Sequence, residues 1–135
     1  MFIERFPFVD TQPRLIIISS NGLGAQGHKD LPWVLKPIYS WLLKEPHADK
    51  EEMERYIHKV GIKNDIKKTT GSLGNVVIVR PALLTNGKER GLDSVRCRER
   101  FPDAWTISRK DVGLFIVTDC VDDTWKGVGV TIAYK

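Results

Sequence analysis

Two short runs of uninterrupted apolar residues dominate the pattern of the chain, at residues 15–18 and 76–79. Both runs are rich in β-branched residues, and residues typical of turns or strand ends follow each of them. Strands of a parallel sheet have this continuous pattern because helices cover both of its faces. We therefore predict two adjacent or near-adjacent parallel strands, over residues 13–20 and 75–80.

The segment between these strands has helical features. Residues 48–60 carry acidic side chains near the start and basic ones near the end, as the helix dipole favours, and Gly61 follows as a C-cap. Residues 33–44 also show helical spacing, which Pro37 disturbs, and we expect Pro46 to end that helix. The connection between the two strands is therefore predicted to be helical.

The second half of the chain continues the alternation. We expect a loop over residues 84–100, followed by a short strand before Ser108. Ser108 and Asp111 have the spacing of a capping box, which predicts a helix after Ser108, and residues 127–134 predict a last strand. Strands that alternate with helices indicate an α/β fold with a mostly parallel sheet.

Three glycines after the first strand, Gly22, Gly24 and Gly27, have the spacing G-x-G-x-x-G of a dinucleotide-binding loop. In that motif a helix follows at once and offers its N-terminus to the pyrophosphate. Here we expect a loop over residues 22–30 and a helix only from about Leu31, because Pro32 suits a first helical turn. We therefore favour a glycine-rich turn over a phosphate-binding loop.

Composition narrows the class of protein. The 135 residues suggest one domain over residues 1–135, with 41% hydrophobic and 28% charged residues. No apolar run approaches the ~20 residues of a membrane span, and the N-terminus lacks the apolar core of a signal peptide. The two cysteines, Cys97 and Cys120, form no CxxC motif, which fits a reducing compartment. We expect a cytoplasmic protein with no membrane partner.

The charged, histidine and tryptophan residues give few further candidates for binding sites. The net charge is +4, and the densest basic group, "VRCRER" at residues 95–100, contains Glu99 and no aromatic residue. We interpret it as a solvated loop and expect no nucleic-acid partner. His28, His47 and His58 lack the spacing of metal ligands, so we expect no metal site, and we interpret Trp105 as packing rather than lining a pocket.

Five segments occur in a familiar order: "LIIISSNGLG", "ADKEEMERYI", "VVIVRPALLTNG", "WTISRKDVGLFI" and "GVTIAY". Their order resembles that of the atypical short-chain dehydrogenase/reductase proteins, and most of all the NmrA-like and flavin-reductase-like NAD(P)-binding group of fungal type. The resemblance covers nearly the whole chain from Pro13 onward. Its most specific feature is "RPALLT" after a strand, followed later by "ISRKDV".

The resemblance implies a partial Rossmann-like, doubly wound sheet. It aligns the first apolar run with the fifth strand of the family, whereas the pyrophosphate glycines lie on the loop after the first strand. The chain then resembles the C-terminal half only, with the first βαβ half missing, as in a truncated gene, a splice product or a mispredicted start. It follows that the spacing of Gly22, Gly24 and Gly27 is coincidental.

The same resemblance implies a site for NADP or NAD. It places Ser19, Ser20 and Asn21 near the nicotinamide side of the cofactor, and residues 81–84 (Pro81, Ala82, Leu83 and Leu84) against the nicotinamide ring. Polar residues at the carboxyl ends of parallel strands agree with this assignment, because open α/β sheets bind ligands there. Two alternatives stay open: the serines cap backbone groups at a strand end, and Pro81 only terminates a strand.

Lys50 is a weak catalytic candidate. It resembles the lysine of the Tyr-x-x-x-Lys pair, in which the lysine lowers the pKa of a tyrosine that acts as general acid or base. The position four residues earlier is Pro46, so that tyrosine is absent. Lys50 then either contacts a ribose hydroxyl or pairs with Glu54 at i,i+4, and we favour the ion pair.

Three functions remain. The first is an NAD(P)-binding, oxidoreductase-like protein, and the second is a non-catalytic NmrA-like regulator or an inactive remnant. The third treats residues 22–27 as a true phosphate loop in a minimal fold. The sequence leaves open whether the chain is an enzyme. Because "LIIIS" is too apolar for a wet sheet edge, we also expect a homo-oligomer or a partner chain that covers that edge.

Overall fold

A computed structural model describes residues 14–41, 44–59, 76–121, 125 and 129–135 of the chain. Its main sheet has four strands in the order β1-β2-β6-β4. The strands are β1 (Leu15–Ile18), β2 (Val76–Pro81), β6 (Gly129–Tyr134) and β4 (Val95–Arg98). The first three are parallel to one another, and β4 is antiparallel to β6. A second sheet pairs β3 (Leu83–Thr85) with β5 (Thr106–Ser108) in parallel.

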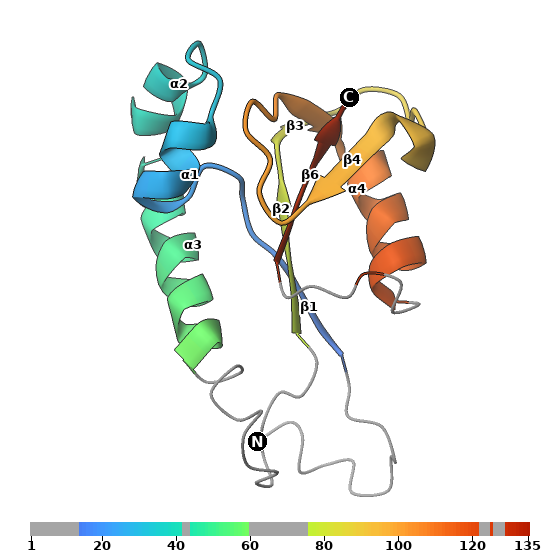
Figure 1. Ribbon diagram of the computed structural model, residues 1–135, viewed down its shortest axis with the longest axis horizontal. Coiled ribbons are helices and arrows are strands. Elements are labelled where there is room, and N and C mark those ends of the chain that lie inside the picture. Colours follow the sequence, from blue (N-terminus) through green and yellow to red (C-terminus); the bar gives the residue numbers. More distant parts are fainter. Residues whose placement is uncertain (1–13, 42–43, 60–75, 122–124, 126–128) are drawn as a thin grey trace, which may run out of the picture.

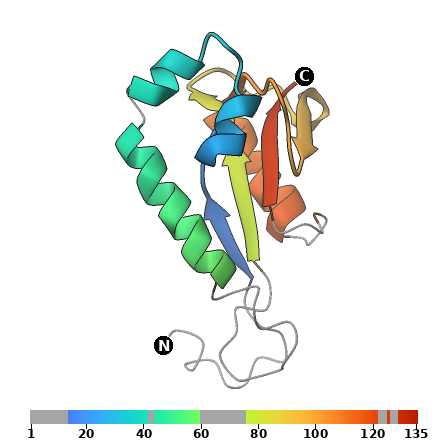
Figure 2. The same cartoon turned by 60° about the vertical axis from the view of Figure 1, so that its left-hand side comes forward.

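The helices surround the main sheet. They are α1 (Gly24–Asp30), α2 (Lys36–Trp41), α3 (Lys44–Ile57), α4 (Arg109–Phe115), the 3₁₀ turn η3 (Leu92–Ser94) and the π-helical turn η4 (Ile116–Val121). Figures 1 and 2 show α3 and α4 on opposite sides of the sheet. The fold is therefore α/β, with a mostly parallel sheet of partial Rossmann-like type, as the sequence predicts. None of the described helices combines the length and apolar content needed to span a bilayer.

The predicted pairing of the two apolar runs is confirmed. β1 and β2 lie side by side in parallel, with Leu15 opposite Val76 and Ile18 opposite Val79. The centre of β2 is fully buried, and its residues pack with those of β6 and α4 in the main core. The members of this core include Val79, Ile107, Val112, Phe115, Val130 and Ile132. The continuous apolar pattern of β2 thus reflects a strand that is covered on both faces, whereas β1 is only partly buried and its Ile18 is 51% exposed.

The expected loop over residues 22–30 is wrong, because α1 begins at Gly24. Gly22 has φ of +84°, a conformation that glycine adopts without strain. A Cβ added to Gly27 would lie 2.9 Å from the carbonyl carbon of Gly22, so α1 packs on the turn at a distance that only glycine allows. The glycines therefore form a tight turn with a helix packed against it. This segment was mistaken for a loop because its glycine-rich composition is typical of loops.

Two further expectations are corrected. Pro46 does not end a helix but lies in the first turn of α3, where the backbone N–H has no intrahelical partner to lose. Residues 84–100 are not all loop, because they contain β4 and the end of β3. In β4, Val95 and Cys97 are turned inward while Arg96 and Arg98 are exposed, so the charged residues concealed the two-residue period of a strand.

Candidate functional site

A pocket at the carboxyl ends of β1 and β2 brings together most of the predicted site residues. We call it the Lys50 pocket, and its volume is about 180 Å³. It is lined by Ser19, Ser20, Lys50, Pro81, Ala82, Leu83, Leu84 and Arg109. The structure thus joins six of the seven predicted cofactor-binding residues with the weak catalytic candidate. The seventh, Asn21, lines a neighbouring pocket.

Backbone hydrogen bonds explain how this pocket is assembled. The amide of Ser19 donates to Val79 at 2.7 Å, and that of Asn21 donates to Pro81 at 2.9 Å. These bonds continue the ladder between the two strands beyond the end of β1. Segments that are about 60 residues apart in the sequence are therefore held together at one strand end, where parallel sheets bind ligands.

The sequence reasoning missed Arg109 as a lining residue. Leu84 pairs with Ile107 in the small sheet of β3 and β5, which places the start of α4 beside the end of β2. Arg109 is the first residue of α4, and its guanidinium donates to the Asn86 side chain at 2.5 Å. The sequence did contain a sign of this contact, because the resemblance paired the segment "RPALLT" with "ISRKDV", which contains Arg109, and the two segments are neighbours in space.

Lys50 does not form the expected ion pair with Glu54. Its ammonium group instead donates to the backbone carbonyl of Ser19, with Nζ and O 3.4 Å apart. Glu54, one turn further along α3, is held by Arg80 on β2. The i,i+4 spacing correctly places Lys50 and Glu54 one turn apart on the helix. However, the guanidinium of Arg80 binds the Glu54 carboxylate in a bidentate geometry that an ammonium group cannot form.

The hydroxyl of Ser19 is a buried polar group with no ordinary hydrogen bond. Ser19 is 3% exposed, and its Oγ has no partner within normal bonding geometry, although it helps to favour the ionised form of Glu54. Ser20 behaves differently, because its Oγ donates to the carbonyl of Asn21 at 3.2 Å. The capping alternative therefore describes Ser20.

The lining has the mixed character of a cofactor site. Pro81 and Ala82 are buried and form a firm apolar wall with the half-buried Leu83, while Ser19 and Lys50 supply polar groups. Such a combination suits a flat ring with a polar substituent. Because 180 Å³ lies below the ~300 Å³ lower bound for drug-sized sites, the pocket has room for only one part of a dinucleotide.

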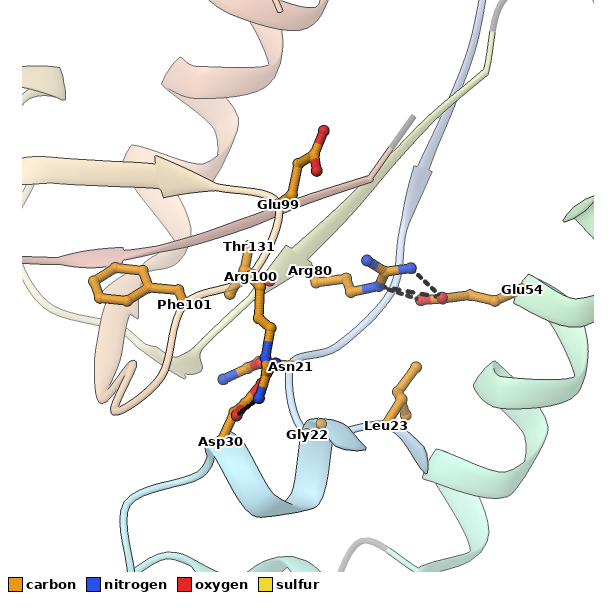
Figure 3. Close-up of a pocket in the computed structure, with 11 residues that line it drawn as sticks. Asn21, Gly22, Leu23, Asp30, Glu54, Arg80, Glu99, Arg100, Phe101 and Thr131 are labelled. Carbon is orange, nitrogen blue, oxygen red and sulfur yellow. Dashed lines mark hydrogen bonds and ion pairs between the residues drawn. The ribbon is translucent and has the colours of Figure 1, made fainter. Parts of the chain in front are cut away.

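The neighbouring pocket, which we call the Asn21 pocket, is about 250 Å³ in volume and has several charged residues in its lining. It is lined by residues of the turn after β1, of α1, α3, β2 and β6, and of the loop after β4: Asn21, Gly22, Leu23, Gly27, Asp30, Glu54, Arg80, Glu99, Arg100, Phe101 and Thr131. Figure 3 shows Asn21 together with the two arginine–carboxylate pairs of this pocket. Arg80 contacts Glu54 at 2.6 to 3.1 Å, and Arg100 contacts Asp30 at 2.5 and 2.6 Å.

Both carboxylates of these pairs stay ionised. Burial opposes the ionisation of Glu54, but the hydrogen bonds from Arg80 outweigh it, and the pKa of Glu54 is lowered. The hydrogen bond from Arg100 lowers the pKa of Asp30 in the same way. Charge is therefore matched within each pair, and the pairs fix the pocket walls.

A third pocket, of about 380 Å³, lies beside β4 and β6. Trp105 lines it and is 48% exposed, which corrects its interpretation as packing. Nearby, the fully buried carboxylate of Asp111 accepts hydrogen bonds from the Tyr134 hydroxyl, from Ser108 Oγ and from the amide of Gly91. The predicted Ser108 cap is confirmed, since Ser108 Oγ accepts from the Asp111 amide at 3.0 Å. This network anchors the wall of the pocket, and its contacts from Tyr134 and Gly91 to Asp111 were not predicted by any sequence motif.

A comparison with known protein families shows which family the chain belongs to. Residues 11–124 match the family described as NAD(P)H-binding. The chain belongs to this NAD(P)H-binding family. NAD or NADP is accordingly the cofactor of the family, in agreement with the resemblance seen in the sequence.

Relatives of this NAD(P)H-binding chain carry names from redox chemistry. It is 37% identical over 131 residues to a protein named reductase pytE from Aspergillus terreus, which covers 90% of the chain and 48% of the relative. It is 32% identical over 122 residues to a protein named oxidase pynE from Aspergillus niger, which covers 84% of the chain and 41% of the relative. The chain thus spans about half the length of these relatives or less. No solved structure matches it.

Proposed function

We propose that the chain is the nicotinamide-side part of an NAD(P)H-dependent oxidoreductase of atypical short-chain dehydrogenase type, NmrA-like and cytoplasmic. The observation that carries this proposal is the Lys50 pocket. Residues that the sequence predicted to contact the cofactor, from the ends of β1 and β2, line this one cavity together with Lys50. The names of the two fungal relatives support the redox class.

The pocket residues fit the nicotinamide and ribose part of NAD(P)H, which when bound supplies a hydride. The apolar wall of Pro81, Ala82 and Leu83 suits one face of the ring. Ser20 and Lys50 add polar groups to the same lining, beside this apolar wall. Lys50 holds only a long hydrogen bond to the Ser19 carbonyl, so a ribose hydroxyl is a competing partner for its ammonium group.

A second candidate function is a non-catalytic NAD(P)H-binding regulator. Among the described residues that line the Lys50 pocket none is a tyrosine, and Tyr56 of α3 is 60% exposed. The usual phenolic proton donor is therefore missing from this wall. Hydride transfer by such a site depends on a proton from Lys50, Ser20 or solvent, whereas a sensor needs no proton donor.

The proposal is tested by comparing two ligands, NADPH and reduced nicotinamide mononucleotide, titrated into the purified chain by calorimetry. If the chain recognises only the nicotinamide side, both ligands bind weakly and with similar dissociation constants. NADPH binding in the micromolar range, on the order of −8 kcal/mol, would contradict this and favour residues 22–27 as a phosphate loop. Failure of both ligands to bind at millimolar concentration would reject the cofactor site itself.

Turnover separates the two candidate functions. Oxidation of NADPH is followed by its absorbance with FMN as the hydride acceptor, first with the native chain and then with the Lys50→Met variant. The enzyme proposal predicts a rate that depends on Lys50. Cofactor binding without any measurable rate would favour the regulator.

A further inference from the structure

We propose that the third pocket, beside β4 and β6, is a second ligand site that binds a flat aromatic carboxylate. We call it the Trp105 pocket, and its volume is about 380 Å³. Among the described residues, none lines both this pocket and the Lys50 pocket. The proposal goes beyond the proposed function, because it does not require that the chain bind a dinucleotide.

The proposal begins with Arg90, whose side chain rests on an aromatic ring. The central carbon of its guanidinium group lies 4.3 Å from the centre of the Tyr134 ring, within the distance of a cation–π interaction. The buried carboxylate of Asp111 holds both partners, since it accepts hydrogen bonds from the Arg90 amide at 3.0 Å and from the Tyr134 hydroxyl. The guanidinium group is therefore positioned before a ligand arrives, which lowers the entropy cost of binding.

The cationic charge of this pocket is not neutralised. In the Asn21 pocket a carboxylate pairs with each arginine, Arg80 and Arg100. Within the described part of the chain, by contrast, neither Arg90 nor Arg96 forms an ion pair, and both residues are exposed. An anion that enters the Trp105 pocket can therefore approach two guanidinium groups whose charge no described carboxylate compensates.

One lining residue is acidic and has to be weighed against these cations. The side chains in the described lining carry positive charges at Arg90, Arg96 and Lys135 and a negative charge at Asp103. The balance stays positive, so it favours an anion over a cation. Guanidinium groups bind a carboxylate through two parallel hydrogen bonds, which makes a carboxylate the anion that we propose.

Aromatic side chains select the rest of the ligand. Trp105 is 48% exposed, although its backbone carbonyl is held by a hydrogen bond from the Leu83 amide at 3.1 Å. Phe101 and Tyr134 line the same pocket. An exposed indole on a fixed backbone offers a flat apolar surface to an aromatic ring. The volume exceeds the ~300 Å³ lower bound for drug-sized sites, so the pocket has room for a ring together with its carboxylate.

Titration of benzoate into the ¹⁵N-labelled chain tests this proposal. The readout is the indole N–H signal of Trp105, identified as the signal that Trp105→Phe removes. Benzamide has the same flat ring without the charge, and cyclohexanecarboxylate has the same charge without the flat ring. We expect benzoate to shift the Trp105 signal in a saturable way, with a dissociation constant in the millimolar range. Each comparison compound should bind about fivefold more weakly, because it lacks one of the two contacts.

Equal binding of benzoate and either comparison compound overturns the proposal, and so does a Trp105 signal that shows no saturable shift with benzoate. This comparison uses the native chain, so it decides the matter even if a variant fails to fold. None of its outcomes bears on the NADPH titration, because the two sites have separate linings.

Variants locate the effect. Arg90→Gln removes the charge over Tyr134 and should weaken benzoate binding about fivefold to tenfold, while the binding of benzamide stays unchanged. Arg98→Gln is the matched control, because Arg98 is an exposed arginine of β4 outside the lining of the pocket, and it should leave both affinities unchanged. Benzoate binding that Arg90→Gln does not weaken, or that both variants weaken equally, overturns the proposal.

Discussion

The ammonium group of Lys50 lies 3.4 Å from the carbonyl oxygen of Ser19 and bridges α3 to the end of β1. This contact places a cation in the lining of a pocket that residues 81–84 also line. The neighbouring turn of α3 is fixed by a much stronger interaction between Glu54 and Arg80. The helix is therefore anchored by Glu54, which leaves Lys50 available for a ligand.

The pair of Glu54 and Arg80 is expected to behave as a coupled unit in stability measurements. Replacing one partner leaves an uncompensated charge that is largely buried, so Arg80→Met or Glu54→Leu alone should lower the free energy of unfolding by about 2–4 kcal/mol. The double variant Arg80→Met with Glu54→Leu should lose less than the sum of the single changes. Urea denaturation measures all four proteins, and strict additivity would show that the pair contributes no coupling.

Asp111 should be the most sensitive single position for stability. Its carboxylate is fully buried, and although burial opposes ionisation, hydrogen bonds from Tyr134, the Arg90 amide and Ser108 lower its pKa. Asp111→Asn removes the charge and mismatches several donors, which should cost about 3 kcal/mol at pH 7.

The pH dependence of this difference follows from the lowered pKa. A carboxylate whose pKa is lower in the folded state stabilises the fold above its unfolded pKa of about 3.9, and that stabilisation is lost as the pH falls through the folded pKa. The gap in unfolding free energy between the native chain and Asp111→Asn should be constant near neutral pH and shrink in acid. A gap that grows below pH 4 would contradict the assignment of an ionised Asp111.

Cys97 should resist thiol reagents at neutral pH. Burial raises the pKa of this thiol to about 11, with Asp119 and Cys120 adding to the effect, and the thiolate is the reactive form. Alkylation by iodoacetamide in the native chain should therefore be slow at pH 8 and accelerate towards pH 11. Fast modification at pH 7 with the fold intact would show that the thiol is ionised and accessible.

The sequence was informative where burial alone sets the pattern. The apolar runs of β1 and β2, the Ser108 cap and the strand-end position of Ser19 all follow from local rules of burial and capping. The sequence was uninformative where contacts are long-range. Nothing near Glu54 indicates that Arg80 would replace Lys50 as its partner, and nothing near Asp111 indicates that Tyr134 would bond to it from β6. β4 was missed because its outward arginines suggested a solvated loop.

The free edge of β1 should make the chain associate. Within the described part of the chain β1 has a strand neighbour on one side only, and Ile18 is 51% exposed there. An apolar edge strand invites pairing with another chain, so we expect a homo-oligomer or a complex with a partner that covers this edge. Ile18→Lys should shift sedimentation towards the monomer, whereas Val117→Lys, the same kind of change on η4, should not. A compact monomer of the native chain at about 10–50 µM would refute the role of the edge.

The central claim, that the Lys50 pocket holds the nicotinamide side of NAD(P)H, is tested most directly by titrating reduced nicotinamide mononucleotide into the ¹⁵N-labelled chain. We predict chemical-shift changes at the amides of Ser19, Ser20, Leu83 and Leu84, and a severalfold weaker affinity for Lys50→Met with its thermal stability unchanged. Changes confined to residues 22–27, or an affinity that does not depend on Lys50, would contradict the claim.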